Sequence, residues 1–104
     1  IDRGYDVTAN HPGLTEWSVP TLARFAGAAN VRVIDKVCGA EDFSCYQKAV
    51  PGFFYFMGCT PPDKDPRTAA PNHSPRFRVD EDCLPLGVKT LAALALDWLA
   101  ANPR

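Results

Sequence analysis

Apolar side chains recur at helical spacing near both ends of the chain. In residues 14–26 and again in residues 83–101 they lie three or four positions apart, which is the spacing of a helix with one apolar face. Gly27 suits the C-terminal cap of the first helix. Pro20 lies inside it, so we expect either that its regular part begins near Ser18 or that the helix bends.

The second of these helices has clear start signals. Asp80 or Asp82 is expected to cap it, and Pro85 fits its first turn. One face carries an apolar row made of Leu84, Val88, Leu91, Ala95, Trp98 and Leu99.

Two segments between these helices have the pattern of strands. Residues 31–37 are rich in β-branched side chains, and residues 53–57 are apolar on both faces, which is typical of a strand covered on both sides. A short helix is expected at residues 41–49. The order of helix, strand, helix, strand and helix predicts an α/β fold with helices packed on a small, incomplete sheet, because two strands make a poor sheet alone.

Composition excludes several classes of partner. The 104 residues are 46% hydrophobic and 22% charged, with a net charge of −1, so no field attracts nucleic acid or an anionic membrane. No run reaches the roughly 18 uninterrupted apolar residues of a membrane span. We therefore expect no nucleic-acid partner and no membrane partner.

Four cysteines, at positions 38, 45, 59 and 83, form no C-x-x-C pair. Two disulfides in three connectivities are possible, but the apolar surroundings favour reduced, mostly buried thiols and a cytoplasmic protein. Cys45 or Cys59 paired with a histidine is a minor alternative, a thiol hydrolase, which spacing cannot establish.

The candidate chemistry lies in residues 58–78, which hold five of the ten prolines and have no periodic apolar pattern. Such long loops often carry function. His73 lies there between Pro71 and Pro75, which restrict the backbone on both sides. A stiffly held imidazole can be a metal ligand, although a loop histidine that packs or faces water is the simpler interpretation.

Neighbouring residues have supporting roles in this interpretation. Asn72 can orient the loop through its side-chain amide, and Phe77 is expected to pack the loop against the core. Arg76 and Arg78 are expected to face solvent. His11 is interpreted as a turn residue and not as a ligand.

Glu41 and Asp42 form a second candidate site. They follow Gly39 after a predicted strand, where open α/β sheets bind ligands. Acids at a helix start are also common because the helix dipole favours them. The two interpretations are about equally supported, with Asp42 the stronger candidate for a functional role.

Four ordered blocks of sequence carry a family resemblance. Residues 10–27, 39–44, 50–58 and 70–77, the last followed by Asp80 and Glu81, resemble the C-terminal part of metal-dependent amidohydrolases of the hippurate hydrolase, aminoacylase and auxin-conjugate hydrolase family. The resemblance implies a two-metal, aminopeptidase- or carboxypeptidase-like catalytic domain interrupted by a lid or dimerisation domain. Residues 1–10 would end that lid domain or a linker, and residues 11–104 would form the C-terminal part of the catalytic domain.

The same resemblance assigns chemistry. It implies that His73 is one ligand of a pair of zinc or manganese ions, and that Glu41, Asp42 and Asn72 contact substrate or support the metal shell. The general base and other ligands would lie upstream, so no catalytic residue is expected here. One histidine cannot hold a catalytic metal, which needs about three protein ligands, and the chain alone should be inactive.

The resemblance also implies partners. The substrate would be a small N-acyl amino acid, and the remainder of the catalytic domain would be the protein partner, possibly within a homodimer. The alternative is a non-catalytic remnant domain that acts by protein–protein association through exposed apolar surface.

Overall fold

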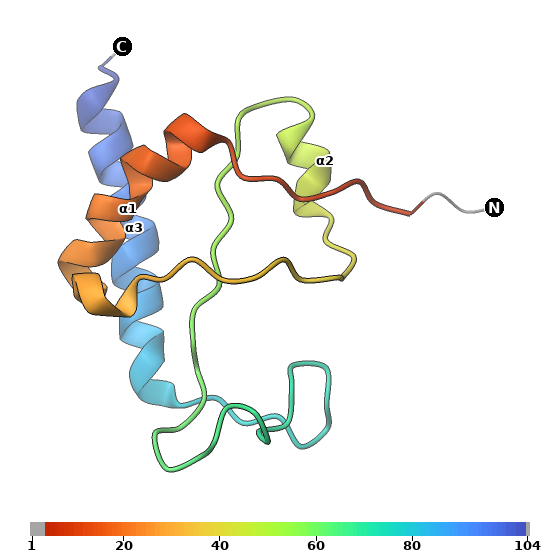
Figure 1. The fold of residues 1–104 in the computed structure, drawn as a ribbon. Coiled ribbons are helices and arrows are strands. Elements are labelled where there is room, and N and C mark those ends of the chain that lie inside the picture. Colours follow the sequence, from red (N-terminus) through yellow and green to blue (C-terminus); the bar gives the residue numbers. More distant parts are fainter. Residues whose placement is uncertain (1–3, 104) are drawn as a thin grey trace.

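Three α-helices and two short 3₁₀ turns make up the regular structure of the chain. The computed structural model describes residues 4–103. Along the chain come α1 (Pro12–Ala26), η1 (Ala28–Asn30), α2 (Phe43–Gln47), η2 (Glu81–Cys83) and α3 (Leu84–Ala101). Helices α1 and α3 lie side by side, whereas α2 and two extended segments lie to one side of them (Figure 1).

Helix α1 begins earlier than Ser18, so that part of the prediction is wrong. His11 is the N-cap residue, and its Nδ1 atom accepts a hydrogen bond from the Leu14 N–H at 3.3 Å. This cap holds a full turn ahead of Pro20, which removes only one backbone donor from the helix interior. The Gly27 cap is confirmed, with a φ of 81° and a bond from its N–H to the Ala23 carbonyl at 2.9 Å.

The predicted start of α3 is confirmed for Pro85 but not for the cap, because the N-cap residue of α3 is Cys83, which makes no side-chain capping bond. The Asp80 carboxylate caps η2 by accepting from the Asp82 N–H at 3.1 Å, and η2 leads directly into α3, where Pro85 occupies the first turn. Proline is favoured there because its missing N–H would have no helical partner.

The two long helices are joined by polar and aromatic contacts. The Asp97 carboxylate accepts from the Thr21 hydroxyl at 2.6 Å and from Arg24 at 2.9 Å. The rings of Trp17 and Trp98 meet edge to face at 5.3 Å. The buried residues of the two helices are small or medium in size, namely Ser18, Thr21, Leu22, Thr90 and Ala93.

Much of the apolar surface of the chain is uncovered. The accessible surface is 8802 Å², about one and a half times the roughly 5,800 Å² that size scaling gives for a compact protein of this mass. Within the apolar row of α3, Val88, Leu91 and Leu99 are at least 63% exposed, whereas Trp98 contacts Trp17 of α1. The row is therefore available for contact with other polypeptide.

The segment Glu81–Ala101 is long and apolar enough to cross a membrane by length and composition alone. Core helices of proteins in water pass the same test, and this one carries Lys89 and Asp97. The expected absence of a membrane partner stays a prediction.

Both predicted strands are wrong for the part of the chain that the structure describes, since residues 4–103 contain no strand. Residues 31–37 run as an exposed connection, and Val33 is 101% exposed. Residues 53–57 are half-buried except for Phe56, but no ladder forms along them. Strand propensity cannot act without a neighbouring strand that accepts the backbone hydrogen bonds, so the incomplete sheet of the α/β prediction is not formed here.

The prediction of mostly buried cysteines is also wrong. Cys38 and Cys45 are exposed, and Cys59 and Cys83 are half-buried. All four are free thiols, as expected. Burial, followed by the charge of the nearby Cys59, raises the pKa of the Cys83 thiol. The cytoplasmic location stays a prediction.

Candidate functional site

His73 lies in a tight turn whose backbone is strained. The turn is closed by a bond from the Ser74 N–H to the Pro71 carbonyl at 3.1 Å. His73 has a φ of 71° and is the one non-glycine residue of the described range with a positive φ. Such a conformation costs on the order of 1 kcal/mol, so the surrounding bonds must hold it.

A second turn follows directly and supports the first. The Phe77 N–H donates to the Ser74 carbonyl at 3.0 Å, and the Arg76 N–H donates to the Ser74 hydroxyl at 3.2 Å. The two ends of the long loop meet where the Asp80 N–H donates to the Cys59 carbonyl at 2.8 Å. His73 is thus presented from a braced loop and not from a free tail.

The imidazole of His73 is exposed. Neither ring nitrogen makes a hydrogen bond to any residue between positions 4 and 103. A ring in this state can accept a metal ion through one nitrogen while the other bonds to a partner.

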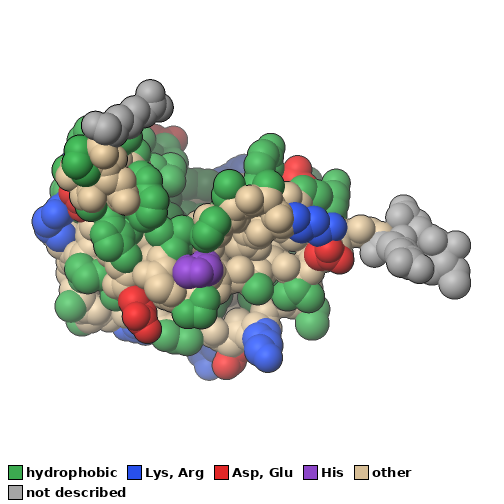
Figure 2. Space-filling model, turned by 90° about the horizontal axis from the view of Figure 1, so that it is seen from above, with side chains coloured by type: hydrophobic (Ala, Val, Ile, Leu, Met, Phe, Trp, Pro, Cys, Tyr) green, Lys and Arg blue, Asp and Glu red, His purple; other side chains and the backbone are tan. Residues whose placement is uncertain are grey.

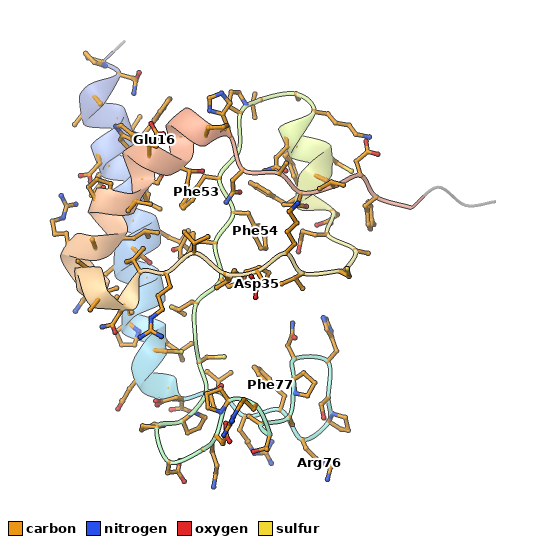
Figure 3. The ribbon with its side chains drawn as sticks, viewed as in Figure 1. Glu16, Asp35, Phe53, Phe54, Arg76 and Phe77 are labelled. Atoms are coloured by element: carbon orange, nitrogen blue, oxygen red, sulfur yellow. The ribbon has the colours of Figure 1, made fainter. Side chains whose placement is uncertain are left out.

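Phe77 holds the loop as expected. It is half-buried and lines a hollow of about 470 Å³ together with Phe56, Met57 and Asn72. Arg76 lies at the outer edge of the loop (Figure 3), and both Arg76 and Arg78 are exposed. The predicted division between a packing phenylalanine and solvated arginines is confirmed.

The side-chain amide of Asn72 does not orient the loop within the described residues. Asn72 is exposed, and its amide has no hydrogen bond to them. The turn is closed by backbone groups instead. A role for Asn72 toward substrate or metal shell stays a prediction.

The side chains of Glu41 and Asp42 have different roles in the structure. A carboxylate oxygen of Glu41 accepts from the Phe43 N–H at 3.1 Å, and its carbonyl accepts from the Ser44 hydroxyl at 2.9 Å. Glu41 therefore stabilises the start of α2. Asp42, at the N-cap position, makes no side-chain capping bond and is exposed, so its carboxylate is free to contact another group.

The candidate residues share one side of the molecule but do not form a metal site. Residues 71–77 and the segment that leads into α2 both lie away from the pair of long helices (Figure 1). Across residues 4–103 no three histidine, cysteine, aspartate or glutamate side chains are grouped closely enough to hold a metal ion. The donor set fits one ligand of a larger site and not a complete site.

Sequence reasoning missed a second feature, an apolar hollow of about 820 Å³ between the helix pair and residues 50–53. Figure 2 shows apolar side chains gathered around a recess on this side of the molecule. Tryptophans on both long helices gave a signal for it. Its lining includes Trp17, Phe43, Phe53, Leu94 and Trp98.

Comparison with known proteins gives a consistent result. Residues 1–97 match the model of peptidase family M20/M25/M40. The chain is 36% identical over 94 residues to thermostable carboxypeptidase 2 of Saccharolobus solfataricus, covering 90% of this chain and 23% of that protein. It is 31% identical over 97 residues to the putative amidohydrolase YhaA of Bacillus subtilis, covering 93% and 24%.

A plant protein is similar over nearly the same region. IAA-amino acid hydrolase ILR1-like 4 of Arabidopsis thaliana is 36% identical over 92 residues, which are 88% of this chain and 20% of that protein. The chain thus spans about a fifth to a quarter of the length of these relatives. No solved structure matches the chain.

Proposed function

The chain belongs to peptidase family M20/M25/M40, and from this premise we propose that it is the C-terminal part of the catalytic domain of a metal-dependent amidohydrolase. The enzyme would hydrolyse the amide bond of N-acyl amino acids. Residues 11–104 would belong to the catalytic domain, and residues 1–10 would end the preceding lid domain or a linker.

The observation that carries this proposal is the state of His73. Its exposed ring, free of hydrogen bonds to the described residues, stands on a strained turn that two further backbone bonds brace. Strain of this kind clusters at functional sites. A solvated loop histidine without a function needs no such turn.

The chain would supply part of a two-metal site. His73 would hold one of two divalent ions, zinc or manganese, and the remaining ligands and the general base would come from other segments of the enzyme. When bound, such ions polarise a carbonyl and lower the pKa of a water. Asp42 would face substrate or a ligand, while Glu41 holds the turn before α2.

The names of the relatives support the substrate class. The plant relative is an IAA-amino acid hydrolase, and an N-acetylcysteine deacetylase of Bacillus subtilis is 36% identical over 58 residues. Both names describe removal of an acyl group from an amino acid. An N-acyl amino acid is therefore the substrate class that we propose.

Replacement of His73 in the longer enzyme tests the proposal. We expect His73→Ala to lower kcat/KM for N-acyl amino acids by at least about 100-fold, since a missing ligand disturbs the metal and the bound water. Bound metal, measured by elemental analysis, should fall with it. Arg76→Ala, at an exposed position three residues away, is the matched control and should leave both unchanged.

Normal turnover and metal content in His73→Ala would contradict the ligand assignment. The 104-residue chain alone should show neither stoichiometric metal nor activity. Tight metal binding by that chain would show that its own donors suffice.

A second candidate function is protein–protein association by a non-catalytic domain. The exposed apolar row of α3 supports it, because surfaces of this kind mark interaction sites. An upstream-extended form that gains hydrolytic activity would exclude this candidate. A homodimer also stays a proposal, and the absence of nucleic-acid and membrane partners stays a prediction.

A further inference from the structure

The side chains of the segment before the His73 loop alternate between two faces. The rings of Phe53 and Tyr55 stack at 5.7 Å, and those of Phe54 and Phe56 meet edge to face at 5.3 Å. Side chains two apart therefore share a face, as in an extended chain. The face that carries Tyr55 continues through residue 57 to residue 59.

Two contacts join this face to α3. The Tyr55 hydroxyl lies 2.9 Å from the hydroxyl of Thr90, a buried residue of the helix. A Cβ atom added to Gly87 would lie 2.9 Å from the Cε atom of Met57, so the Met57 side chain packs directly against the helix backbone. In Figure 1 the segment runs alongside α3 toward the start of that helix.

The same register leads to a pair of cysteines. Cys59 comes two residues after Met57 and therefore on the same face of the segment. Cys83 comes four residues before Gly87, and as the N-cap residue of α3 it has helical φ and ψ values of −77° and −23°. Residues four apart in a helical conformation share a face, so Cys83 is the next residue of α3 that Cys59 can meet.

Backbone hydrogen bonds bring the two cysteines to one shared neighbour. The Asp80 N–H donates to the Cys59 carbonyl at 2.8 Å, and the Asp80 carbonyl accepts from the Cys83 N–H at 3.1 Å. Burial, followed by the charge of Cys59, raises the pKa of the Cys83 thiol. Because such an electrostatic effect falls off with distance, the two sulfurs are near neighbours.

The pair is reduced and accessible to a small reagent. Cys59 and Cys83 are free thiols, and both residues are half-buried. Cys59 lines the hollow of about 470 Å³ beside the His73 loop, which gives a reagent an approach to its sulfur. The other two cysteines, Cys38 and Cys45, are fully exposed and lie outside this contact.

We propose that Cys59 and Cys83 form a reversible disulfide that closes the base of the loop carrying His73, with a small-molecule disulfide such as oxidised glutathione as the oxidant. The bond would join the two ends of residues 60–82, which the hydrogen bond between Cys59 and Asp80 already holds together. A disulfide needs Cα atoms within about 7 Å of each other, so its formation also tests the register with α3.

The reaction is a thiol–disulfide exchange in two steps. The Cys59 thiolate attacks one sulfur of oxidised glutathione, so that a Cys59–glutathione bond forms, the S–S bond of the reagent breaks and one glutathione thiolate leaves. The Cys83 thiolate then attacks the Cys59 sulfur, and the second glutathione thiolate leaves. The two protein thiols lose two electrons and two protons, and both pass to the two molecules of reduced glutathione that are released.

Tryptic mapping of the oxidised 104-residue chain identifies the bond. Lysine and arginine positions divide the four cysteines among three peptides: residues 37–48 contain Cys38 and Cys45, residues 49–64 contain Cys59, and residues 79–89 contain Cys83. After equilibration with a glutathione buffer, mass spectrometry should find peptides 49–64 and 79–89 joined by a bond that a reductant cleaves. Joining of either peptide to residues 37–48 instead, or glutathione alone on both, would overturn the proposal.

Comparison with the unfolded chain shows whether the fold places the pair. In a Cys38→Ser/Cys45→Ser variant, we expect the equilibrium constant of the disulfide against glutathione to be at least about tenfold larger in buffer than in concentrated urea. By linkage, the disulfide must raise the folding equilibrium constant by the same factor, and urea unfolding of the oxidised and reduced forms measures this independently. Equal constants in buffer and in urea would contradict a pair that the fold brings together.

Single substitutions provide a matched comparison. Cys83→Ser should stop the reaction at the first step, with one glutathione attached to Cys59. Cys45→Ser is the control and should change the equilibrium constant of the Cys59–Cys83 bond by less than about twofold, since the site is not part of the pair. Loss of the bond in the control would assign the oxidation to a different pairing and reject the proposal.

The disulfide and the proposed function fail separately. A mapped Cys59–Cys83 bond in a longer enzyme without hydrolytic activity would retain the disulfide and reject the function. Hydrolytic activity that depends on His73, in an enzyme whose two cysteines never join under oxidation, would retain the function and reject the disulfide.

Discussion

The pair of long helices and the extended half of the chain, represented by residues 31–40 and 53–57, differ in how their backbone N–H and carbonyl groups find hydrogen-bond partners. Helices α1 and α3 bond internally and are joined by the Thr21–Asp97–Arg24 contacts. Residues 31–40 make few hydrogen bonds: the Val31 N–H donates to the Ala28 carbonyl of η1, and the Arg32 side chain donates to the Ala29 carbonyl. Val33 is fully exposed. A helix completes its hydrogen bonds within one segment, whereas a strand needs a second segment.

The comparison shows which part of the chain can fold without other polypeptide. The helix pair buries Leu22 and Ala93 at its contact. The extended half exposes apolar side chains that only a further layer can cover. Substitutions in the first region should therefore change the stability of the 104-residue chain, and substitutions in the second should not.

The largest effect is expected at Leu22. It is 7% exposed, so Leu22→Ala should lower the free energy of unfolding by about 2 kcal/mol or more through lost contacts and a cavity. Urea unfolding followed by far-ultraviolet circular dichroism measures this. Val19→Ala, on the same helix but 38% exposed, is the control, and an equal loss at both positions would contradict a core at this contact.

A smaller loss is expected at the end of α1. Gly27 has a φ of 81°, which an L side chain rarely adopts, so Gly27→Ala should cost about 1–2 kcal/mol. Gly39→Ala is the matched control, because an added Cβ there meets nothing within 4 Å and its φ is not positive. The same unfolding measurement should detect a loss at Gly27 alone.

A pH-dependent effect is expected at Asp97. The hydrogen bond from Thr21, followed by Arg24, lowers the pKa of this carboxyl below 3.8. Because the folded-state pKa is the lower one, the stabilisation is complete above the unfolded-state pKa and is lost as the pH falls through the folded-state pKa. Asp97→Asn should therefore lower Tm at neutral pH and have little effect in strong acid.

Asp63→Asn is the control for this titration. Asp63 is an exposed carboxylate that pairs with the adjacent Lys64 at 3.1 Å, far from the helix contact in sequence. A Tm difference for Asp97→Asn that stays constant down to strong acid would show that its carboxylate charge does not join the helices.

The smallest effect is expected in the extended half. Val33 is 101% exposed, so Val33→Thr should change the stability of the 104-residue chain by less than about 0.5 kcal/mol. Thermal unfolding of the chain with and without Val33→Thr measures this. A clear loss in the chain would show that residues 31–37 contact something, and a loss confined to the longer enzyme would show that other segments cover them.

The sequence predicted the helical elements and the candidate loop better than the extended ones. The Gly27 cap is a local signal and is confirmed, whereas Asp80 caps η2 and not α3 itself. The start of α1 was wrong because the His11 side-chain cap outweighs the penalty of Pro20. The hydrogen bonds between the Asn10 side chain and the Phe54 backbone span 44 positions, and no local pattern predicts them.

The local setting of the candidate site could be predicted, whereas its role stays a prediction. Family membership and the exposed, proline-bracketed position of His73 could be inferred from residues close together in the chain. The positive φ of His73 and the division of Glu41 from Asp42 could not, since both depend on which backbone groups accept hydrogen bonds in the folded loop. Whether His73 binds metal stays a prediction.

The order of side chains alone determined where helices form, where the irregular loop lies and which family the chain belongs to, because helix periodicity, capping and family motifs are read over short stretches. Only the tertiary structure decided which apolar faces are covered and that two strand-like segments stay without a ladder. The physical reason is that burial and strand pairing depend on segments distant in sequence, and the described residues leave part of that surface uncovered.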